Sequence, residues 1–301
     1  MPFLIAALVL LLLLLLGGLY FAYIVTFPKC FGFEETYEIE KASGKLVEAD
    51  FQRMEKEVLR LPSPYGYELH GYYFPVPGSK RGVILSHGIT YTLFGSVKYM
   101  KIFRDLGFNV LIYDLRNHGK SGGRSSTFGY YERYDLQALT TWMIEKIGPD
   151  AVIGTHGESM GAGISLMHAA LDARIRFVVS DCSYSELPAL LSYRIQQDYH
   201  LPAFPLIPTA SLMSKLLTGM RFEDVRPAQE VQKISAPVLF IHGAEDDFIP
   251  TRQVYTLYEN KTRGPRQMYA APNAAHAESF WTNQEEYTRV VTRFLMDNQI
   301  L

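Results

Sequence analysis

Residues 151–162 of the chain read AVIGTHGESMGA, in which a short apolar run leads directly into Gly157-Glu158-Ser159-Met160-Gly161. The pattern predicts a strand over 151–154 and a helix over 160–171. A serine on a sharp turn between a strand and a helix projects its hydroxyl above the sheet, and the positive end of the helix faces the reacting centre. Ser159 is therefore the candidate nucleophile.

A serine nucleophile needs a histidine that takes its proton, and that histidine needs an acid that holds its tautomer. In this strand-turn-helix arrangement the chain order is serine, acid, histidine. His276 is the only histidine beyond the candidate acids, so it is selected by elimination. The acid is Asp246 or Asp247, and we favour Asp246 because its offset from Pro250 gives an Asp-x-x-aliphatic-Pro pattern.

Acyl transfer passes through a tetrahedral oxyanion, which two backbone N–H groups must stabilise. One is expected from Met160, the residue after the serine. The other is expected from the loop after a strand at 82–86, where residues 87–90 read His-Gly-Ile-Thr, and we assign it to Ile89. The run 114–123 contains Asp, Arg and His but precedes the serine, so we interpret it as a turn that braces this loop.

Short β-branched runs alternate with helix-length amphipathic segments from residue 82 onward, which is typical of a mainly parallel sheet covered by helices. The near-continuous apolar character of the runs indicates burial on both faces of the sheet. An aromatic stretch at 65–76 with two glycines suggests an antiparallel pair before them. Expected strands are 82–86, 110–113, 151–154, 177–180, 237–241 and 267–270; expected helices are 97–106, 132–147, 160–171, 252–260 and 284–297.

One stretch breaks this alternation. Residues 183–235 separate two expected strands by far more than the usual connection of about 2 to 6 residues. Pro202, Pro205 and Pro208 interrupt short apolar helical segments there, and Leu, Phe and Met recur through 201–217. We interpret the insertion as a helical lid over a ligand pocket, the alternative being a structural elaboration only.

The N-terminus carries a candidate membrane helix. Residues 3–25 contain no charged side chain, and 23 residues at about 1.5 Å each would span a ~30 Å hydrocarbon core. A cleaved signal peptide is the alternative, but no Lys or Arg precedes the run and no clear cleavage site follows. We expect an anchor over 1–27, a catalytic domain over 28–301 and a single-pass location in the cell membrane. By the positive-inside rule, Lys29, Lys41 and Lys45 after the helix weakly favour a catalytic domain on the cytoplasmic side. If the helix acts as a signal-anchor, the domain would lie on the other side.

The composition of the chain limits the classes of molecule that it is expected to bind. The 301 residues are 48% hydrophobic and carry 29 Lys+Arg against 31 Asp+Glu, a net charge of −2. A near-neutral chain without a cluster of Lys and Arg lacks the positive charge that binds a phosphate backbone. We therefore expect a small-molecule substrate and no nucleic-acid partner. Two cysteines match neither a disulfide framework nor a zinc spacing, and no glycine-rich phosphate loop occurs. We therefore expect no cofactor and no catalytic metal.

These motifs together resemble the α/β-hydrolase superfamily of serine hydrolases. The resemblance rests on His87-Gly88, the run 114–123, the serine turn, the Asp246 turn and the late His276, and it covers roughly residues 67–298. More specifically, the chain is similar to membrane-anchored bacterial hydrolases related to monoacylglycerol lipases and cinnamoyl esterases. The resemblance implies an α/β-hydrolase fold and a Ser-Asp-His triad, but no particular substrate.

The leading hypothesis is a carboxylic-ester hydrolase that acts on acyl or aromatic-acyl esters. A peptidase or amidase would use the same triad, although no Glu-Glu pair for recognising a free amino terminus stands in the insertion. A membrane-tethered scaffold without catalytic activity is the third possibility. A damaged triad would indicate it, and all three residues are present here. The oligomeric state does not follow from the sequence.

Overall fold

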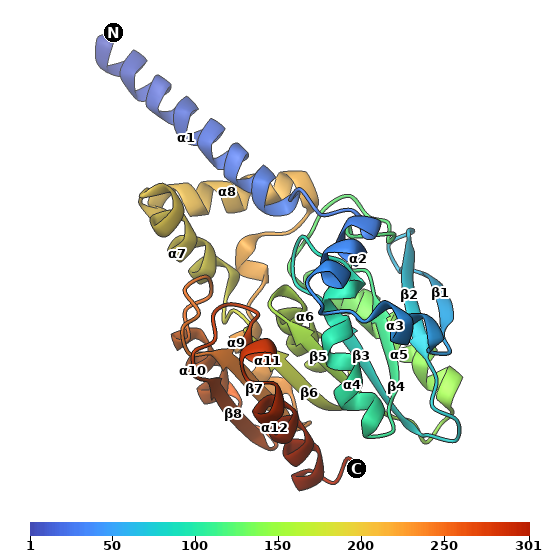
Figure 1. Ribbon diagram of the computed structural model, residues 1–301. Coiled ribbons are helices and arrows are strands. Elements are labelled where there is room, and N and C mark those ends of the chain that lie inside the picture. Colours follow the sequence, from blue (N-terminus) through green and yellow to red (C-terminus); the bar gives the residue numbers. More distant parts are fainter.

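The computed structural model describes residues 1–301 and is built around one eight-stranded sheet (Figure 1). The strand order is β1-β2-β4-β3-β5-β6-β7-β8. The pairs β1–β2 and β2–β4 are antiparallel, and all the others are parallel. The strands are β1 Glu57–Pro62, β2 Glu68–Phe74, β3 Arg81–Ser86, β4 Asn109–Tyr113, β5 Val152–Glu158, β6 Ile175–Asp181, β7 Val238–Gly243 and β8 Arg266–Ala271.

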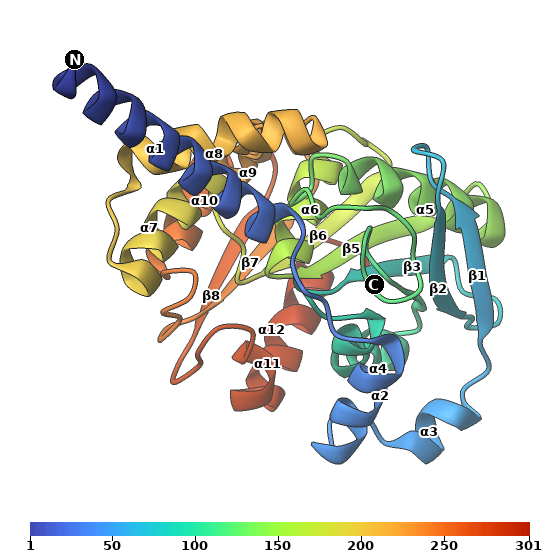
Figure 2. The ribbon, with the colours of Figure 1, turned by 90° about the horizontal axis from the view of Figure 1, so that it is seen from above.

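Helices cover both faces of this sheet. The helices are α1 Pro2–Thr26, α2 Phe33–Ala42, α3 Glu48–Arg53, α4 Val97–Asp105, α5 Glu132–Ile147, α6 Met160–Ala169, α7 Leu187–Tyr199, α8 Ala203–Thr218, α9 Pro227–Glu230, α10 Arg252–Asn260, α11 Ser279–Thr282 and α12 Gln284–Asp297, with short 3-10 turns at Leu93–Ser96, Phe222–Asp224 and Val231–Lys233. In Figure 2, α5 and α6 lie over one face, and α4 and α12 lie over the other. Each face buries its own apolar cluster, so the sheet is sandwiched between two hydrophobic layers.

The expected parallel strands are confirmed. The inner strands bury their apolar runs almost throughout, and all five residues of β4 are buried, for example, whereas the edge strand β8 buries only Ala271. The prediction that both strands of an antiparallel pair lie within 65–76 was wrong for the first strand. That strand is β1 at Glu57–Pro62, and the chain reverses between the strands with Gly66 at φ +79°. Edge strand β1 reads EVLRLP and buries only Leu59, so its apolar pattern is too short to predict a strand.

Two helical segments lie outside the layers that cover the sheet. The insertion at 183–235 contains α7, α8 and α9, with Pro208 inside α8. Helix α1 is the one helix in the structure long and apolar enough to cross a membrane, with a mean hydropathy of 2.8 over its most apolar window. Its first half projects away from the domain, whereas its second half packs across α8 (Figures 1 and 2).

Helices α2 and α3 were not expected from the sequence. They lie between α1 and β1 and bury Phe33 and Phe51 on the same face of the sheet as α4. Their charged residues give weak apolar periodicity, so their place is set by contacts with distant residues.

Candidate active site

Ser159 lies at the junction of β5 and α6, with φ 54° and ψ −116°. This backbone conformation is unfavourable for a residue with a Cβ, and such strain is found mainly at functional sites. The turn is tight because glycines flank it: a Cβ on Gly161 would lie 2.2 Å from the carbonyl oxygen of Ser86 on β3. The sequence Gly-x-Ser-x-Gly therefore forms the expected sharp turn, and the serine lies at the carboxyl edge of the parallel strands.

The structure brings together the three residues selected from the sequence. The Oγ of Ser159 lies 2.9 Å from Nε2 of His276, in the loop after β8. The Nδ1 of His276 lies 2.8 Å from Oδ2 of Asp246, in the loop after β7. With its proton on Nδ1, the imidazole donates to the carboxylate and accepts from the serine hydroxyl. Asp247 makes no such contact; its backbone carbonyl instead accepts hydrogen bonds from Tyr193 and Arg194 of α7.

Asp246 is held as a carboxylate. Its Oδ1 accepts hydrogen bonds from the N–H groups of Phe248, at 3.0 Å, and Ile249, at 2.8 Å. Its Oδ2 lies 3.2 Å from Nε2 of His242, a residue to which sequence reasoning gave no role. Burial raises the pKa of Asp246, but the hydrogen bonds from His242 and His276 outweigh it and bring that pKa down to about 2. The acid is thus ionised and oriented toward the imidazole.

The loop that carries Ile89 is fixed by two histidine rings. His87 donates from Nδ1 to the carbonyl of Gly88, at 2.7 Å, and accepts from the N–H of Leu115 at 3.0 Å. His118, in the run 114–123, accepts from the N–H of Thr90 at 3.0 Å. The run therefore contacts the loop as expected. Ile89 and Met160 both line the cavity that contains Ser159.

The N-terminal segment contacts the same loop from the other side, which the sequence did not indicate. The N–H of Phe31 donates to the carbonyl of Thr90 at 2.9 Å. The hydroxyl of Tyr91 donates to Glu40 of α2 at 2.7 Å. Residues 31–40 are therefore part of the framework around the candidate oxyanion site.

The cavity at Ser159 is small and apolar. It has a volume of about 90 Å³, and eight of its ten lining residues are hydrophobic. They are Ile89, Phe128, Ser159, Met160, Tyr184, Leu190, Leu191, Arg194, Phe248 and Ile249. Leu190, Leu191 and Arg194 belong to α7, so the insertion forms one wall.

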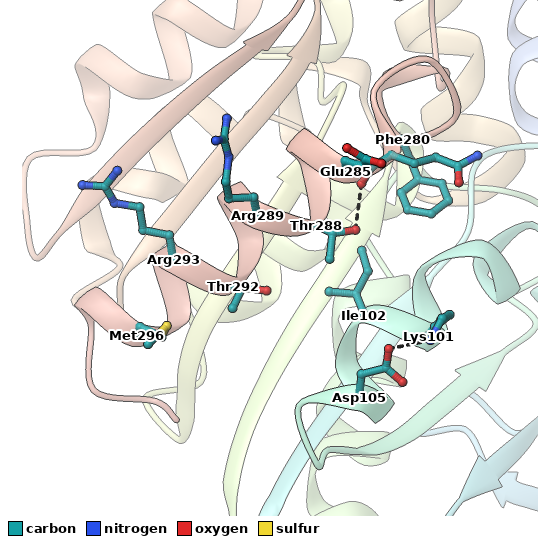
Figure 3. Close-up of a pocket in the computed structure, with 11 residues that line it drawn as sticks. Lys101, Ile102, Asp105, Phe280, Glu285, Thr288, Arg289, Thr292, Arg293 and Met296 are labelled. Atoms are coloured by element: carbon teal, nitrogen blue, oxygen red, sulfur yellow. Dashed lines mark hydrogen bonds and ion pairs between the residues drawn. The ribbon is translucent and has the colours of Figure 1, made fainter.

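A larger groove, of about 610 Å³, lies between α4 and α12 (Figure 3). It contains none of the candidate catalytic residues, and only three of its eleven lining residues are hydrophobic. Lys101 and Asp105 pair with each other along its α4 side at 2.6 Å. We therefore place the candidate site at the smaller cavity, which contains Ser159.

A buried charged cluster lies beside Ser159. Lys98 of α4 forms an ion pair with Glu158, the residue before the serine, and their side chains are only 8% and 10% exposed. Tyr99 donates to Glu158 at 2.5 Å and to Asp181 at 3.2 Å. Lys98 also donates to the carbonyl of Ala277 at 3.3 Å, next to the candidate histidine. Burial, together with the charge of Glu158, raises the pKa of Asp181 to about 6.

One group of donor atoms has the proximity that a metal site requires. Single ligand atoms of Cys182, Asp246 and His276 lie within 4.8 Å of one another. Burial raises the pKa of the Cys182 thiol well above its usual value, so the sulfur stays protonated, whereas metals bind the thiolate. The other two residues already bond to each other. The donor set therefore fits a hydrogen-bonded pair better than a metal site.

Comparisons with known proteins agree with this geometry. A family model described as the alpha/beta hydrolase fold matches residues 83–224. Over 280 residues the chain is 39% identical to the uncharacterized protein YqkD of Bacillus subtilis, covering 92% of each chain. The chain belongs to the α/β-hydrolase superfamily. The expected family and fold are therefore confirmed.

Two solved structures show how this hydrolase compares with enzymes of its fold. The esterase Pf2001 of Pyrococcus furiosus superposes with a TM-score of 0.69 at 25% identity, covering 84% of this chain and 95% of that one. Est1E of Butyrivibrio proteoclasticus, with ferulic acid bound, superposes with a TM-score of 0.65 at 17% identity, covering 81% of this chain and 100% of that one. The second likeness shows the fold alone.

Proposed function

We propose that the protein is a serine hydrolase that cleaves carboxylic esters through an acyl-enzyme. The observation that carries the proposal is the unbroken chain of hydrogen bonds from Ser159 through His276 to Asp246. An ester is favoured over an amide because Pf2001, which resembles this chain in sequence and structure, is described as an esterase.

In this mechanism the hydroxyl of Ser159 attacks the ester carbonyl while Nε2 of His276 takes its proton. Asp246 keeps the imidazole in the productive tautomer and stabilises the imidazolium. The N–H groups of Ile89 and Met160 stabilise the negative charge on the tetrahedral oxygen. The imidazolium then protonates the leaving alcohol, and water, activated by the same histidine, releases the acid and restores the serine.

The acyl group is the part of the substrate that the cavity would accept. An apolar space of about 90 Å³ beside the nucleophile fits a short acyl chain or part of an aromatic acid. We also propose that the insertion at 183–235 forms a lid over the cavity, because Leu190 and Leu191 of α7 line one side of this space. A longer acyl chain would require α7 to move.

Helix α1 supports a second part of the proposal, a single-pass anchor over residues 1–27 with the hydrolase domain at 28–301. Before Gly18, α1 has no buried residue, and only its C-terminal part packs on the domain. Lys29 follows the helix, and the positive-inside rule then favours the cytoplasmic side for the domain.

The test is hydrolysis of p-nitrophenyl esters of increasing acyl length by the full-length protein in detergent. Ser159→Ala is expected to lower kcat/KM by at least about 10⁴-fold, since no nucleophile remains. Ser165→Ala is the matched control, because Ser165 lies on α6, is buried and has no hydrogen-bond partner for its hydroxyl. Equal activity of the two variants would refute the mechanism. Faster turnover of aminoacyl amides than of esters would refute the substrate class.

A further inference from the structure

Helix α8 presents an apolar outer face to solvent. Residues 205, 208, 212 and 216 follow the spacing of one helix face, and they are Pro205, Pro208, Leu212 and Leu216. Leu216 is 74% exposed and Leu212 is 44% exposed, and Phe204, just before them, is 78% exposed. We call these five residues the outer face of α8. A contiguous exposed apolar surface of this kind marks an interaction site.

None of these five residues is charged. Lys215, the only charged residue of α8, is exposed and borders the outer face, since it follows Pro208 by seven positions and Leu212 by three; its ammonium donates to the carbonyl of Gly219 at 2.6 Å, at the C-terminal end of the helix. The surface is therefore apolar with one cation at its edge, and a long lysine side chain at such an edge can reach the headgroup region.

The outer face is continuous with the interface between α8 and α1. Gly17 of α1 lies against Leu206, and Gly18 lies so close to Thr209 that an added Cβ would come within 2.5 Å of its methyl group. Phe21 and Ala22, one turn further along α1, are buried in the same cluster as Ile207 and Ala210 of α8. Figures 1 and 2 both show α8 lying across the C-terminal half of α1.

The length of α1 decides where α8 lies relative to a bilayer. Gly17 already contacts α8, so at most the 15 residues from Pro2 to Leu16 precede the contact, and they span at most about 22 Å at ~1.5 Å each. A hydrocarbon core is ~30 Å thick, so about 8 Å of it must be crossed by the part of α1 that packs on α8. Interfacial helices bury their apolar faces to a similar depth, about 5–10 Å.

We propose that the outer face of α8 lies among the lipid acyl chains of one leaflet, beside α1. The proposal rests on the proposed membrane anchor, and it adds that α8 itself enters the membrane. The occupant of the surface is the bilayer, because a spanning α1 brings α8 below the headgroups and the outer face has no charge to keep it out. The wall of the active-site cavity, α7, directly precedes this helix.

The test measures the depth of single labelled positions in the full-length protein, reconstituted in vesicles of phosphatidylcholine and phosphatidylglycerol. In a Cys30→Ser background, with Cys182 left buried and unreactive, a polarity-sensitive fluorophore is attached to Leu216→Cys. Lipids that carry a nitroxide on the acyl chain quench only fluorophores within the hydrocarbon. Leu10→Cys, within α1, reports the anchor itself. Val58→Cys is the matched control, because Val58 is apolar and 61% exposed on β1, on the opposite side of the domain from α1 (Figure 1).

We expect the fluorophores at Leu216→Cys and Leu10→Cys to lose about half of their intensity or more, with emission shifted to shorter wavelength, and the one at Val58→Cys to change little. Quenching at Leu10→Cys but not at Leu216→Cys would overturn this proposal and leave the anchor intact. Quenching at neither position would overturn the anchor and this proposal together. Quenching at all three positions would show non-specific adsorption and also overturn it.

Discussion

Removing the positive charge of Lys98 is predicted to destabilise the protein strongly. Lys98→Met keeps most of the side-chain volume but leaves Glu158 without its ion-pair partner in a place where both side chains are nearly inaccessible to water. Breaking a buried ion pair by removing one partner costs about 3–5 kcal/mol, because the remaining charge is neither solvated nor paired. Lys98 also stabilises the charge of Asp181, so two carboxylates lose their compensating cation.

The loss is predicted to depend on pH. In the folded protein the pKa of Asp181 is about 6, above its usual value of 3.8, so the folded state binds this proton more tightly than the unfolded state does. The contribution of Asp181 to the free energy of unfolding is therefore most favourable below pH 3.8 and decreases as the pH rises to about 6. Without Lys98 the pKa of Asp181 rises further. At a pH above that pKa, each added unit lowers the free energy of unfolding by about 1.4 kcal/mol. The deficit of Lys98→Met should be larger at pH 8 than at pH 5.5.

Urea unfolding of the full-length protein at both pH values measures this difference. Lys101→Met is the matched control: Lys101 lies one turn along the same helix, and its pair with Asp105 is 83% and 60% exposed. A pair so exposed is worth at most about 1 kcal/mol. Adding Glu158→Gln to Lys98→Met should recover part of the loss, because one uncompensated carboxylate is removed. Equal losses for Lys98→Met and Lys101→Met, or a deficit that is the same at both pH values, would refute the reasoning.

Two further substitutions test the candidate site. Asp246→Asn is expected to lower kcat by about 10⁴-fold, because the amide no longer holds the imidazole in its productive tautomer, whereas Asp247→Asn should retain activity because Asp247 forms its hydrogen bonds through its backbone carbonyl. Ester hydrolysis by both variants decides between the two acids, and comparable losses would contradict the assignment. Tyr91→Phe removes the hydrogen bond to Glu40, so we expect a loss of about 0.5–1.5 kcal/mol in stability and a lower kcat with little change in KM. An unchanged kcat with a lowered melting temperature would show that this bond stabilises the fold without positioning the oxyanion loop.

The parts that the sequence predicted well are those with local signals. The parallel strands are short apolar runs, and the glycines around Ser159 mark a turn that no other residue could form. Chain order then selected His276, and the position of Asp246 in its turn selected it over Asp247; the structure places both within hydrogen-bond reach of the chain from Ser159, and their catalytic roles stay predictions. These inferences needed only patterns within a few residues, together with the order of elements in an α/β fold.

The parts that were missed depend on contacts between distant segments. Glu158 and Asp181 become neighbours through the register of β5 against β6, and Lys98 reaches them from α4. None of these charges stands in a recognisable motif. His242 gains its role only because the turn after β7 folds Asp246 back onto its ring. Helix α2 is likewise positioned by contacts with a loop some 50 residues away, such as Tyr91 with Glu40.

The attachment of α1 affects which molecules the hydrolase could reach. The carbonyl of Thr26, the last residue of α1, accepts a hydrogen bond from the N–H of Ser126 at 2.8 Å, and a few residues later Phe31 bonds to the loop beside Ile89. A domain on a flexible tether would sweep a volume of solvent, but if α1 spans the membrane as proposed, a domain fixed in this way would keep Ser159 at a constant height above the bilayer. Its search for substrate would then become two-dimensional. The encounter rate would follow the surface density of esters in the same membrane, and a large dissolved ester at equal total concentration would be met far less often.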